Sequence, residues 1–431
     1  MAFALLGTVQ VTLIATITVI TVALPAIQRD LRVDDAGMVL VSSAYGLAFG
    51  GLLLLGGRLT DSLGRRRVFV TGMVIFGPAS VAAALAPWPG MLMIARFAQG
   101  IGAALAAPAA MALLGVVFPD PHRRGRALAM WGVLSSAGAT AGTVLSGMAI
   151  TWVSWRWVFL APVVMSAVAV AAASRLFPAD RPQGRKRIDW LGAVLVTAGL
   201  AVLIYGLQRS AWIVFGGVVL LVLFGLAERR SPAPLMPLPF LGRRILPLIA
   251  VTFCAGAMAT GFFLLSLHLQ QVRGLSPLET SAAFLLPAPA IFASGPLAGR
   301  LIPRLGIHRV LAIGLVAAAL GLLLLSLLDM PYAGLLIFPF GAGVTFSAAT
   351  LAAMHGVRDD QTGLAGGLLN TAMEIGPPLG LAVLVSLATA YSHHPPSGYA
   401  FALRIAAAVL FVTALFSAPT RRTEKTKGNT E

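Results

Sequence analysis

Charge is scarce in this sequence, and acidic charge is the scarcest. Only 11% of the 431 residues are charged, and 15 acidic side chains stand against 31 basic ones. Soluble domains carry about 25% charged residues, so this composition excludes a water-soluble globular protein. Hydrophobic residues make up 58% of the chain, and the mean hydropathy is +0.89. The sequence is therefore that of an integral membrane protein.

Residues for catalysis and metal binding are also few. Cys254 is the only cysteine and lies within an apolar run, so the chain forms no internal disulfide and thiol chemistry is not expected. No HExxH, GxSxG or GxxxxGK[ST] motif occurs, which argues against an enzyme, a metal site, a cofactor and ATP-driven export. No basic face interleaved with aromatic residues appears, so nucleic acid is not an expected partner.

Long apolar runs make up most of the sequence. A membrane span needs about 20 apolar residues, and the runs predict fourteen spans. The first is interpreted as a retained span because it lacks a basic leader and a clear cleavage site. The predicted spans are 3–26, 38–57, 68–86, 91–114, 127–149, 157–176, 190–207, 211–227, 246–267, 280–299, 309–328, 332–354, 364–390 and 399–417.

The basic residues lie almost entirely on one side of these spans. Alternate connections, counted with the N-terminus inside, hold 24 Lys and Arg residues against five on the other side. Cytoplasmic connections are the ones enriched in Lys and Arg. We therefore expect a multi-pass protein of the cell membrane with both termini cytoplasmic.

One twelve-residue segment occurs twice. Gly57–Val68 reads GRLTDSLGRRRV and Gly299–Val310 reads GRLIPRLGIHRV, with seven identical positions at a spacing of 242 residues. Internal repeats are typical of secondary transporters. The repeat predicts a six-helix bundle at 1–180 and another at 245–418. Two inserted helices at 188–228, expected to contact only lipid and neighbouring helices, lengthen the spacing, and 419–431 is a cytoplasmic tail.

Four motifs carry a family resemblance. The first repeat copy resembles the signature loop of the major facilitator superfamily. Arg96–Gly102 (RFAQGIG), Trp155–Leu160 (WRWVFL) and Leu269–Pro277 (LQQVRGLSP) resemble motifs of its fourteen-helix drug:proton antiporters and occur in the same order. The resemblance implies an all-α major facilitator fold of two six-helix bundles plus two central helices. It also implies export of hydrophobic or amphipathic small molecules by proton antiport with alternating access.

The sequence departs from that family in its first and fifth spans. Members usually carry an Asp and an Asn before the ALP sequence, whereas here Thr16 and Thr21 precede Ala23-Leu24-Pro25, and Thr143 replaces a motif proline. An uptake carrier or uniporter of the same superfamily therefore remains an alternative, and a membrane-embedded enzyme is a third. For the leading hypothesis, the antiporter, we expect a small-molecule substrate, protons and membrane lipid as partners, and a monomer as the working form.

Two ionisable residues within spans are candidates for proton coupling. Charge at mid-span costs about 2.5–3.5 kcal/mol and is a functional hypothesis by default. Glu374 lies near the middle of the thirteenth span, where burial favours the neutral acid, so it is predicted to take up and release a proton. The alternative is a neutral side chain that bonds to a neighbouring helix. Arg96 stays cationic, and the resemblance gives its motif a role in proton transfer; the alternative is hydrogen bonding to nearby carbonyls.

Two further groups of residues are predicted to control access and substrate contact. By resemblance, the repeated hairpins latch the halves on the cytoplasmic side, although Asp61 is also explained as a solvated loop charge and Pro303 replaces it in the second copy. The predicted gate residues are Gly57, Asp61, Gly64, Arg65, Arg300 and Gly306. The predicted substrate cavity, suited to a bulky and largely apolar molecule, is lined by Thr16, Thr21, Tyr45, Gln99, Met258, Phe340, Phe346 and Asn370.

Overall fold

A computed structural model describes most of the chain. The described residues are 1–118, 142–178, 189–232, 234–235, 238–328, 332–357, 362–392 and 394–417, with single residues at 120, 123, 127, 134 and 138. Thirteen segments among them are helical, long enough and apolar enough to cross a membrane. Each coincides with a predicted span. The remaining one, 127–149, lies mostly outside the described residues, although its last part, 142–149, is helical.

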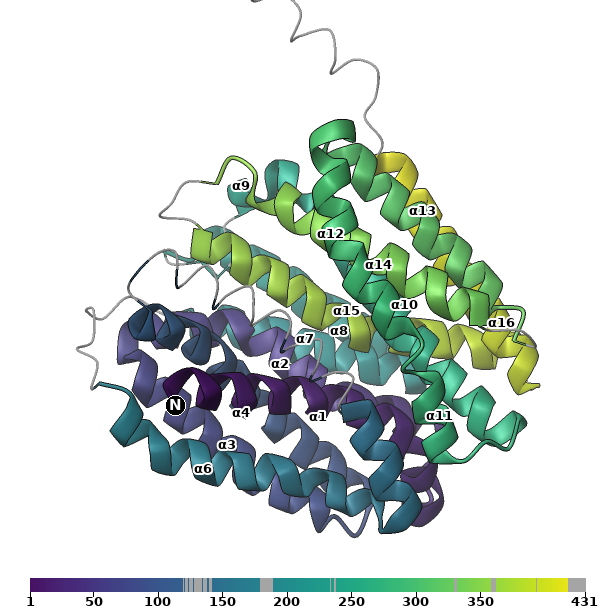
Figure 1. Cartoon of the computed structure of the whole chain (residues 1–431), viewed down its shortest axis with the longest axis horizontal. Helices are drawn as coiled ribbons and strands as arrows, with labels where there is room; N and C mark the ends of the chain where they lie inside the picture. The colour runs from purple at the N-terminus through teal and green to yellow at the C-terminus, as the bar shows by residue number, and fades with distance from the viewer. Residues whose placement is uncertain are drawn as a thin grey trace, which may run out of the picture. The chain divides into compact units, whose positions relative to one another are not determined.

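The first compact unit consists of Met1–Leu238, Phe262–Leu285 and Leu381–Val383. Within it, α4 packs against α2 and α3, α6 packs against α3, and α7 packs against α8 and α2 (Figure 1). Its helices are α1 (Ala2–Leu31), α2 (Asp35–Leu63), α3 (Arg65–Ala84), α4 (Pro89–Val117), η1 (Trp155–Phe159), α6 (Leu160–Leu176), α7 (Trp190–Arg209) and α8 (Ala211–Arg230). The unit also contains η3 (His268–Val272) and α11 (Pro277–Ala283).

The second compact unit consists of Pro239–Gly261, Leu286–Gly380 and Leu384–Glu431. Here α13 packs against α14 and α16, and α12 packs against α14 (Figure 1). The elements that begin near or within it are α9 (Leu238–Leu241), η2 (Gly242–Arg244), α10 (Ile245–Leu267), α12 (Pro287–Leu305), α13 (Ile307–Leu325), α14 (Tyr332–Met354), α15 (Thr362–Tyr391) and α16 (Pro395–Ser417). The predicted division into six, two and six helices stays a prediction.

Packing in the two units follows one pattern. The pairs α2–α4, α3–α4 and α3–α6 of the first unit correspond to α12–α14, α13–α14 and α13–α16 of the second. Gly72 and Gly314, again 242 residues apart, lie at corresponding crossings. A Cβ atom at Gly72 would lie 2.6 Å from the Gly102 carbonyl oxygen, and one at Gly314 would lie 3.1 Å from that of Gly341. Small residues allow such close approach, so the duplication extends beyond the twelve repeated residues.

The repeated segment forms the same turn in both places. Gly64 has φ 101° and ψ 141° between α2 and α3, and Gly306 has φ 84° and ψ 154° between α12 and α13. The Gly64 N–H donates to the Thr60 carbonyl at 3.2 Å, and the Gly306 N–H donates to that of Ile302 at 2.9 Å. Only glycine adopts this backbone conformation readily, which explains why both copies carry it.

The tenth predicted span differs from the structure in being interrupted. Helix α11 ends at Ala283, and α12 starts at Pro287 after a turn. Proline has no N–H and suits the first turn of a helix better than its interior. The apolar run at 280–299 hides this break because hydropathy does not register the missing hydrogen bond.

Candidate functional site

Arg96 of α4 lies at the centre of a polar cluster in the first unit. Its side chain is 0% exposed. Its Nη1 donates to the Thr16 carbonyl at 2.9 Å and to Gln99 Oε1 at 3.4 Å. The guanidinium carbon lies 5.0 Å from the centre of the Tyr45 ring, within the range of a cation–π interaction. Neutral oxygens and an aromatic ring therefore surround this cation, and among the described residues it forms no ion pair.

Three more helices are tied to this cluster. Gln99 Nε2 donates to Ser80 Oγ at 2.8 Å, and the Ser80 hydroxyl donates to the Phe76 carbonyl at 2.7 Å, which connects α3. The Tyr45 hydroxyl of α2 donates to the Leu13 carbonyl of α1 at 3.1 Å. Buried polar networks gain rigidity when their groups are satisfied. Helices α1 to α4 therefore converge on Arg96.

The Arg96 cluster contains three of the predicted cavity residues. The side chains of Thr16, Tyr45 and Gln99 are buried within the helix packing together with Arg96. The Nε and Nη2 atoms of Arg96 have no hydrogen-bond partner among the described residues. A buried donor without a partner is costly, and these two donors are free to bind an acceptor or to favour a negative charge nearby.

Glu374 has the opposite surroundings in the second unit. Its side chain on α15 is partly buried, and no hydrogen bond or ion pair joins it to another described residue. The Thr371 hydroxyl, three residues earlier, is buried and also lacks a partner there. Helix α15 continues through Pro377 and Pro378, which have no N–H to donate to the carbonyls four residues earlier. Unpaired polar groups therefore lie within one helical turn of Glu374 along α15, and a proton-binding role for this residue stays a prediction.

A close helix crossing fixes the backbone next to Glu374. A Cβ atom at Gly256 of α10 would lie 2.7 Å from the Gly376 carbonyl oxygen, and one at Gly380 would lie 2.5 Å from Gly256 Cα. Such contacts exclude any larger residue at these three positions unless the helices separate. The crossing of α10 and α15 thus fixes the backbone position of Glu374 relative to α10.

The remaining predicted cavity residues are less enclosed. Met258, Phe340 and Phe346 are partly buried and Asn370 is exposed, all four in the second unit with Glu374. Thr21 of α1 is partly buried, and its carbonyl accepts a hydrogen bond from the Ser266 hydroxyl at 3.1 Å. Substrate contact by any of the predicted cavity residues stays a prediction.

The predicted gate residues lie on the two repeated turns. Asp61 is exposed and Arg65 partly buried, and neither has a polar partner in the part of the chain that the structure describes. Gly57 is partly buried and Arg300 is exposed. The turn glycines Gly64 and Gly306 have the positive φ described above. The latch itself stays a prediction.

Two arginines of the first turn do make contacts. Arg58 Nη2 donates to the Pro234 carbonyl at 3.1 Å, so the segment after α8 is tied to α2. Arg66 Nη1 donates to the Phe177 carbonyl at the end of α6 at 3.3 Å. These contacts join the first turn to other parts of the same unit.

The WRWVFL motif forms a polar cluster with the C-terminal end of α1. Trp155 Nε1 donates to Asp30 Oδ2 at 2.9 Å, and Arg156 forms an ion pair with the same carboxylate. Arg156 Nη2 also donates to the Ala86 carbonyl at 3.1 Å. The motif therefore fastens η1 to α1 and to the end of α3. Sequence reasoning missed Asp30, although it is the only acidic residue of α1 and lies at the helix end.

The LQQVRGLSP motif forms the connection from α10 to α11. Gly274 has φ +70°, and Ser276 caps α11 in a capping box with Glu279. Gln271 Nε2 donates to Gln28 Oε1 of α1 at 3.0 Å. The residues of the motif therefore shape the turn, start the next helix and hold both against α1.

Comparisons with known proteins identify the family. The model of the Major Facilitator Superfamily matches residues 6–381. The chain belongs to the major facilitator superfamily. The puromycin resistance protein pur8 of Streptomyces alboniger is 36% identical over 93% of this chain and 87% of its own length. The lincomycin resistance protein of Streptomyces lincolnensis is 34% identical over 97% and 91%. The cephamycin export protein CmcT of Amycolatopsis lactamdurans is 36% identical over 86% and 81%.

Solved structures of superfamily transporters share the fold. The crystal structure of the peptide transporter POT in complex with sulfate has a TM-score of 0.72 at 17% identity, covering 96% of this chain and 93% of that one. The POT family transporter PepTSo has a TM-score of 0.72 at 14% identity, covering 98% of each. The predicted fold class and family are confirmed: this major facilitator protein is an all-α, multi-pass membrane protein that handles small molecules.

Proposed function

We propose that this major facilitator protein exports hydrophobic or amphipathic small molecules, antibiotics among them, in exchange for protons. Relatives that match most of the chain are named for puromycin resistance, lincomycin resistance and cephamycin export. The observation that carries proton coupling is the state of Glu374, a carboxylic acid without a described partner at mid-helix beside two prolines. A group that binds a proton reversibly needs such freedom, since a fixed ion pair would hold it in one state.

In the proposed cycle, Glu374 is protonated from the outside and releases its proton to the cytoplasm as the two halves alternate in access. Arg96 does not take up and release the transported proton, because its guanidinium stays charged. Its two unpaired donors favour a negative or acceptor group in the first half. Substrate then binds where apolar and aromatic side chains such as Phe340 and Phe346 offer contact area without fixed charge.

The proposal extends to location and partners. The excess of Lys and Arg in alternate connections supports a cell-membrane protein with cytoplasmic N- and C-termini. We include a monomeric working form, lipid surroundings and the absence of enzymatic activity. Among the described residues no group of three or more His, Cys, Asp or Glu side chains is placed to hold a metal ion.

An uptake carrier or uniporter of the same superfamily is the second candidate. It is favoured by the first helix, where Thr16 and Thr21 stand in place of the Asp and Asn that members of the resembled antiporter family usually carry. Threonine side chains do not titrate, so neither residue can carry the coupled proton. The Thr16 hydroxyl donates to the Thr12 carbonyl at 2.7 Å.

Transport by reconstituted protein tests the proposal. Purified protein in proteoliposomes with an acidic lumen is given labelled puromycin, lincomycin or a cephamycin. Antiport predicts drug accumulation in the lumen as protons leave, and a protonophore abolishes it. Glu374→Gln is expected to lose this accumulation while retaining drug exchange at equal pH, because only the proton site is removed.

Glu228→Gln is the matched control. Glu228 on α8 is a carboxyl that is more deeply buried than Glu374, and it accepts a hydrogen bond from the Leu235 N–H at 3.0 Å, which the side-chain oxygen of glutamine can accept as well. Gradient-driven accumulation by Glu374→Gln would remove that residue as the coupling acid. Accumulation that requires an alkaline lumen would indicate symport, and equilibration without accumulation would indicate a uniporter.

A further inference from the structure

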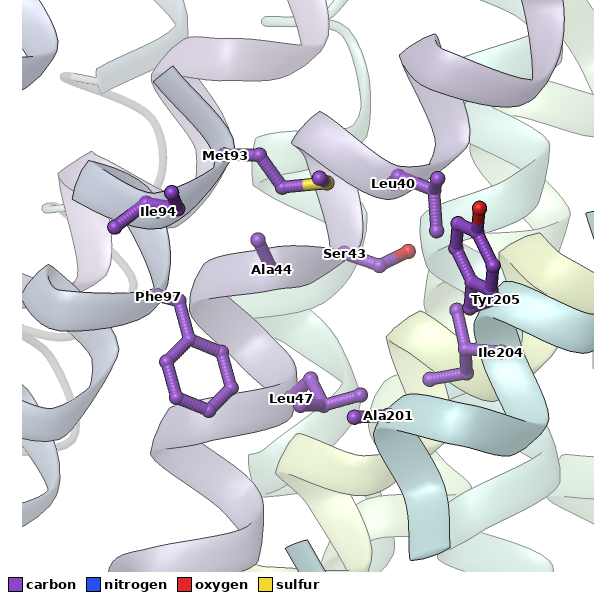
Figure 2. A pocket seen from close by; sticks show the side chains of 10 residues that line it. All are labelled: Leu40, Ser43, Ala44, Leu47, Met93, Ile94, Phe97, Ala201, Ile204 and Tyr205. Atoms are coloured by element: carbon purple, nitrogen blue, oxygen red, sulfur yellow. The ribbon is translucent and has the colours of Figure 1, made fainter. Parts of the chain in front are cut away.

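A cavity of about 280 Å³ lies between α2, α4 and α7 in the first unit. Its lining residues follow helical spacing on each helix, so one face of each contributes. The lining consists of Leu40, Ser43, Ala44, Leu47, Met93, Ile94, Phe97, Ala201, Ile204 and Tyr205 (Figure 2). Helix α7 belongs to the pair inserted at 188–228, which the sequence predicts to contact only lipid and neighbouring helices.

The cavity forms where α2 and α7 diverge. A Cβ atom at Gly51 would lie 3.3 Å from Thr197 Cα, so the two backbones are in contact there. One helical turn away on both helices, Leu47 and Ala201 already line the cavity. Ile94 and Tyr205 at its margin are 65% and 42% exposed, and such apolar exposure in a membrane span faces lipid. An apolar molecule dissolved in the bilayer therefore has a lateral route into the cavity.

Ser43 gives this apolar cavity a single buried polar anchor. The residue is 3% exposed, and its hydroxyl has no hydrogen-bond partner among the described residues. Figure 2 shows that hydroxyl directed into the space among the lining side chains, on the side of Tyr205. Helical serines commonly bond a carbonyl three or four residues earlier; Ser80 does so at 2.7 Å. The Ser43 hydroxyl is turned away from that carbonyl.

Neither water nor a lipid chain satisfies this hydroxyl well. A buried water typically makes about three hydrogen bonds, whereas the lining offers only two polar side chains, Ser43 and Tyr205, and Tyr205 lies at the exposed margin. Ser43 lies eight residues beyond the start of α2, which is about 12 Å along the helix. At that depth an acyl chain offers methylene groups only.

We propose that this cavity binds an apolar small molecule with one carbonyl-type hydrogen-bond acceptor, which enters from the membrane and accepts a bond from the Ser43 hydroxyl. Ligand pockets of this kind are mostly apolar with few polar groups that fix orientation, and they start at about 300 Å³. The site uses the inserted helix α7, and its lining includes neither Glu374 nor Arg96 and its hydrogen-bond partners. Its test measures binding, so its outcome is separate from that of the proposed export.

Benzophenone is a suitable probe because it is apolar, has one carbonyl acceptor and inserts into C–H bonds on irradiation. Full-length protein in phospholipid nanodiscs is irradiated with increasing benzophenone, and the adducts are mapped by peptide mass spectrometry. Saturable labelling is expected on the peptides that contain Leu40, Met93 and Tyr205. Ser43→Ala should weaken binding and so raise the half-saturation concentration about threefold to tenfold, the equivalent of one hydrogen bond.

Two further variants make the result interpretable. Ser166→Ala is the matched control, because the Ser166 hydroxyl on α6 is equally buried and unpartnered but does not line the cavity. Its labelling should equal that of the unaltered protein. Ala201→Phe should fill the cavity and remove saturable labelling while the unfolding temperature is retained. Equal labelling of all variants would overturn the proposal, and so would saturation of the same peptides by a mid-chain diazirine phospholipid with no displacement by benzophenone.

Discussion

Arg96 and Glu374 are the main ionisable groups within the two repeated halves, and their surroundings differ. Arg96 is enclosed by α1 to α4, with a carbonyl, an amide and a tyrosine ring in contact. Glu374 is partly buried on α15 and has no described partner. The backbones that carry them are built alike, since the turns at Gly64 and Gly306 and the crossings at Gly72 and Gly314 correspond.

Under the proposed function, this difference suits two tasks on one duplicated scaffold. A fully enclosed cation held by neutral groups keeps its charge and position, and it sets a fixed field in the first half. A carboxylic acid without partners can change its charge with little rearrangement. The first half therefore suits a constant electrostatic role and the second half a changing one.

Substitution of Arg96 should have the largest effect on this comparison. Arg96→Met keeps the volume of the side chain but removes the charge. The substitution also removes two buried nitrogen donors that have no partner among the described residues, which are costly to bury, so the unfolding temperature should stay the same or rise. Proton-driven transport in proteoliposomes should fall at least about tenfold, equivalent to about 1.4 kcal/mol in the barrier.

The alternative for Arg96 is a purely structural role, and Arg96→Lys separates the two. Lysine keeps the charge but lacks the planar group that contacts both Tyr45 and the Thr16 carbonyl. A field effect predicts that Arg96→Lys keeps more of the proton-driven transport than Arg96→Met does. Equal transport by both variants would contradict a functional role for the charge.

The two turns offer a test of how far the halves are alike. Gly64→Ala and Gly306→Ala each place a side chain at a φ that glycine alone adopts easily, which should cost about 1–3 kcal/mol of stability. No atom lies within 4 Å of a Cβ built at Gly306, so the cost there is backbone strain alone. Thermal unfolding in detergent should show similar losses for both.

Alanine at a neighbouring exposed helical position, Leu63→Ala, controls for handling of the variants. A loss at Gly64 with none at Gly306 would mean that the two turns are not equivalent in the folded protein. The similar hydrogen bonds of both turns, at 3.2 and 2.9 Å, argue for equivalence.

Much of the fold was predictable because its determinants are local in sequence. Apolar runs locate the helices, and the repeated GRL–LG segment locates both turns. The break before Pro287 was also present in the sequence, but hydropathy averages over it. Helix ends such as Leu63 extend beyond the predicted run because a helix continues past the apolar segment into polar surroundings.

The site was predictable only as residue types. Arg96, Tyr45 and Gln99 were expected near the middle of spans, but their partner Ser80 comes from another helix, and the Thr16 contact uses a carbonyl that every residue has. The cavity on α7 depends on the divergence of two helices before Gly51 on α2 and after Thr197 on α7. A serine at position 43 looks like any other helical serine until its hydroxyl is seen to lack a partner.

The smallest expected effect is on stability, at the two arginines in equivalent positions of the repeat. Arg58 donates to the Pro234 carbonyl at 3.1 Å, whereas Arg300, 242 residues later, is exposed and has no polar partner in the described part of the chain. A net hydrogen bond contributes about 1 kcal/mol, and surface changes away from such contacts stay within about 0.5 kcal/mol.

Arg58→Ala should therefore lower the unfolding temperature measurably, while Arg300→Ala should not. The carbonyl of Pro234 follows α8, so the lost bond would free the segment after the inserted helices from the first turn. Hydrogen exchange at the Ser231 and Leu235 amides is the sharper measurement, because it should rise in Arg58→Ala alone. An equal response in both variants would show that the Arg58 hydrogen bond does not hold the segment after α8 in place. The polar difference between the halves would then depend on Arg96 and Glu374.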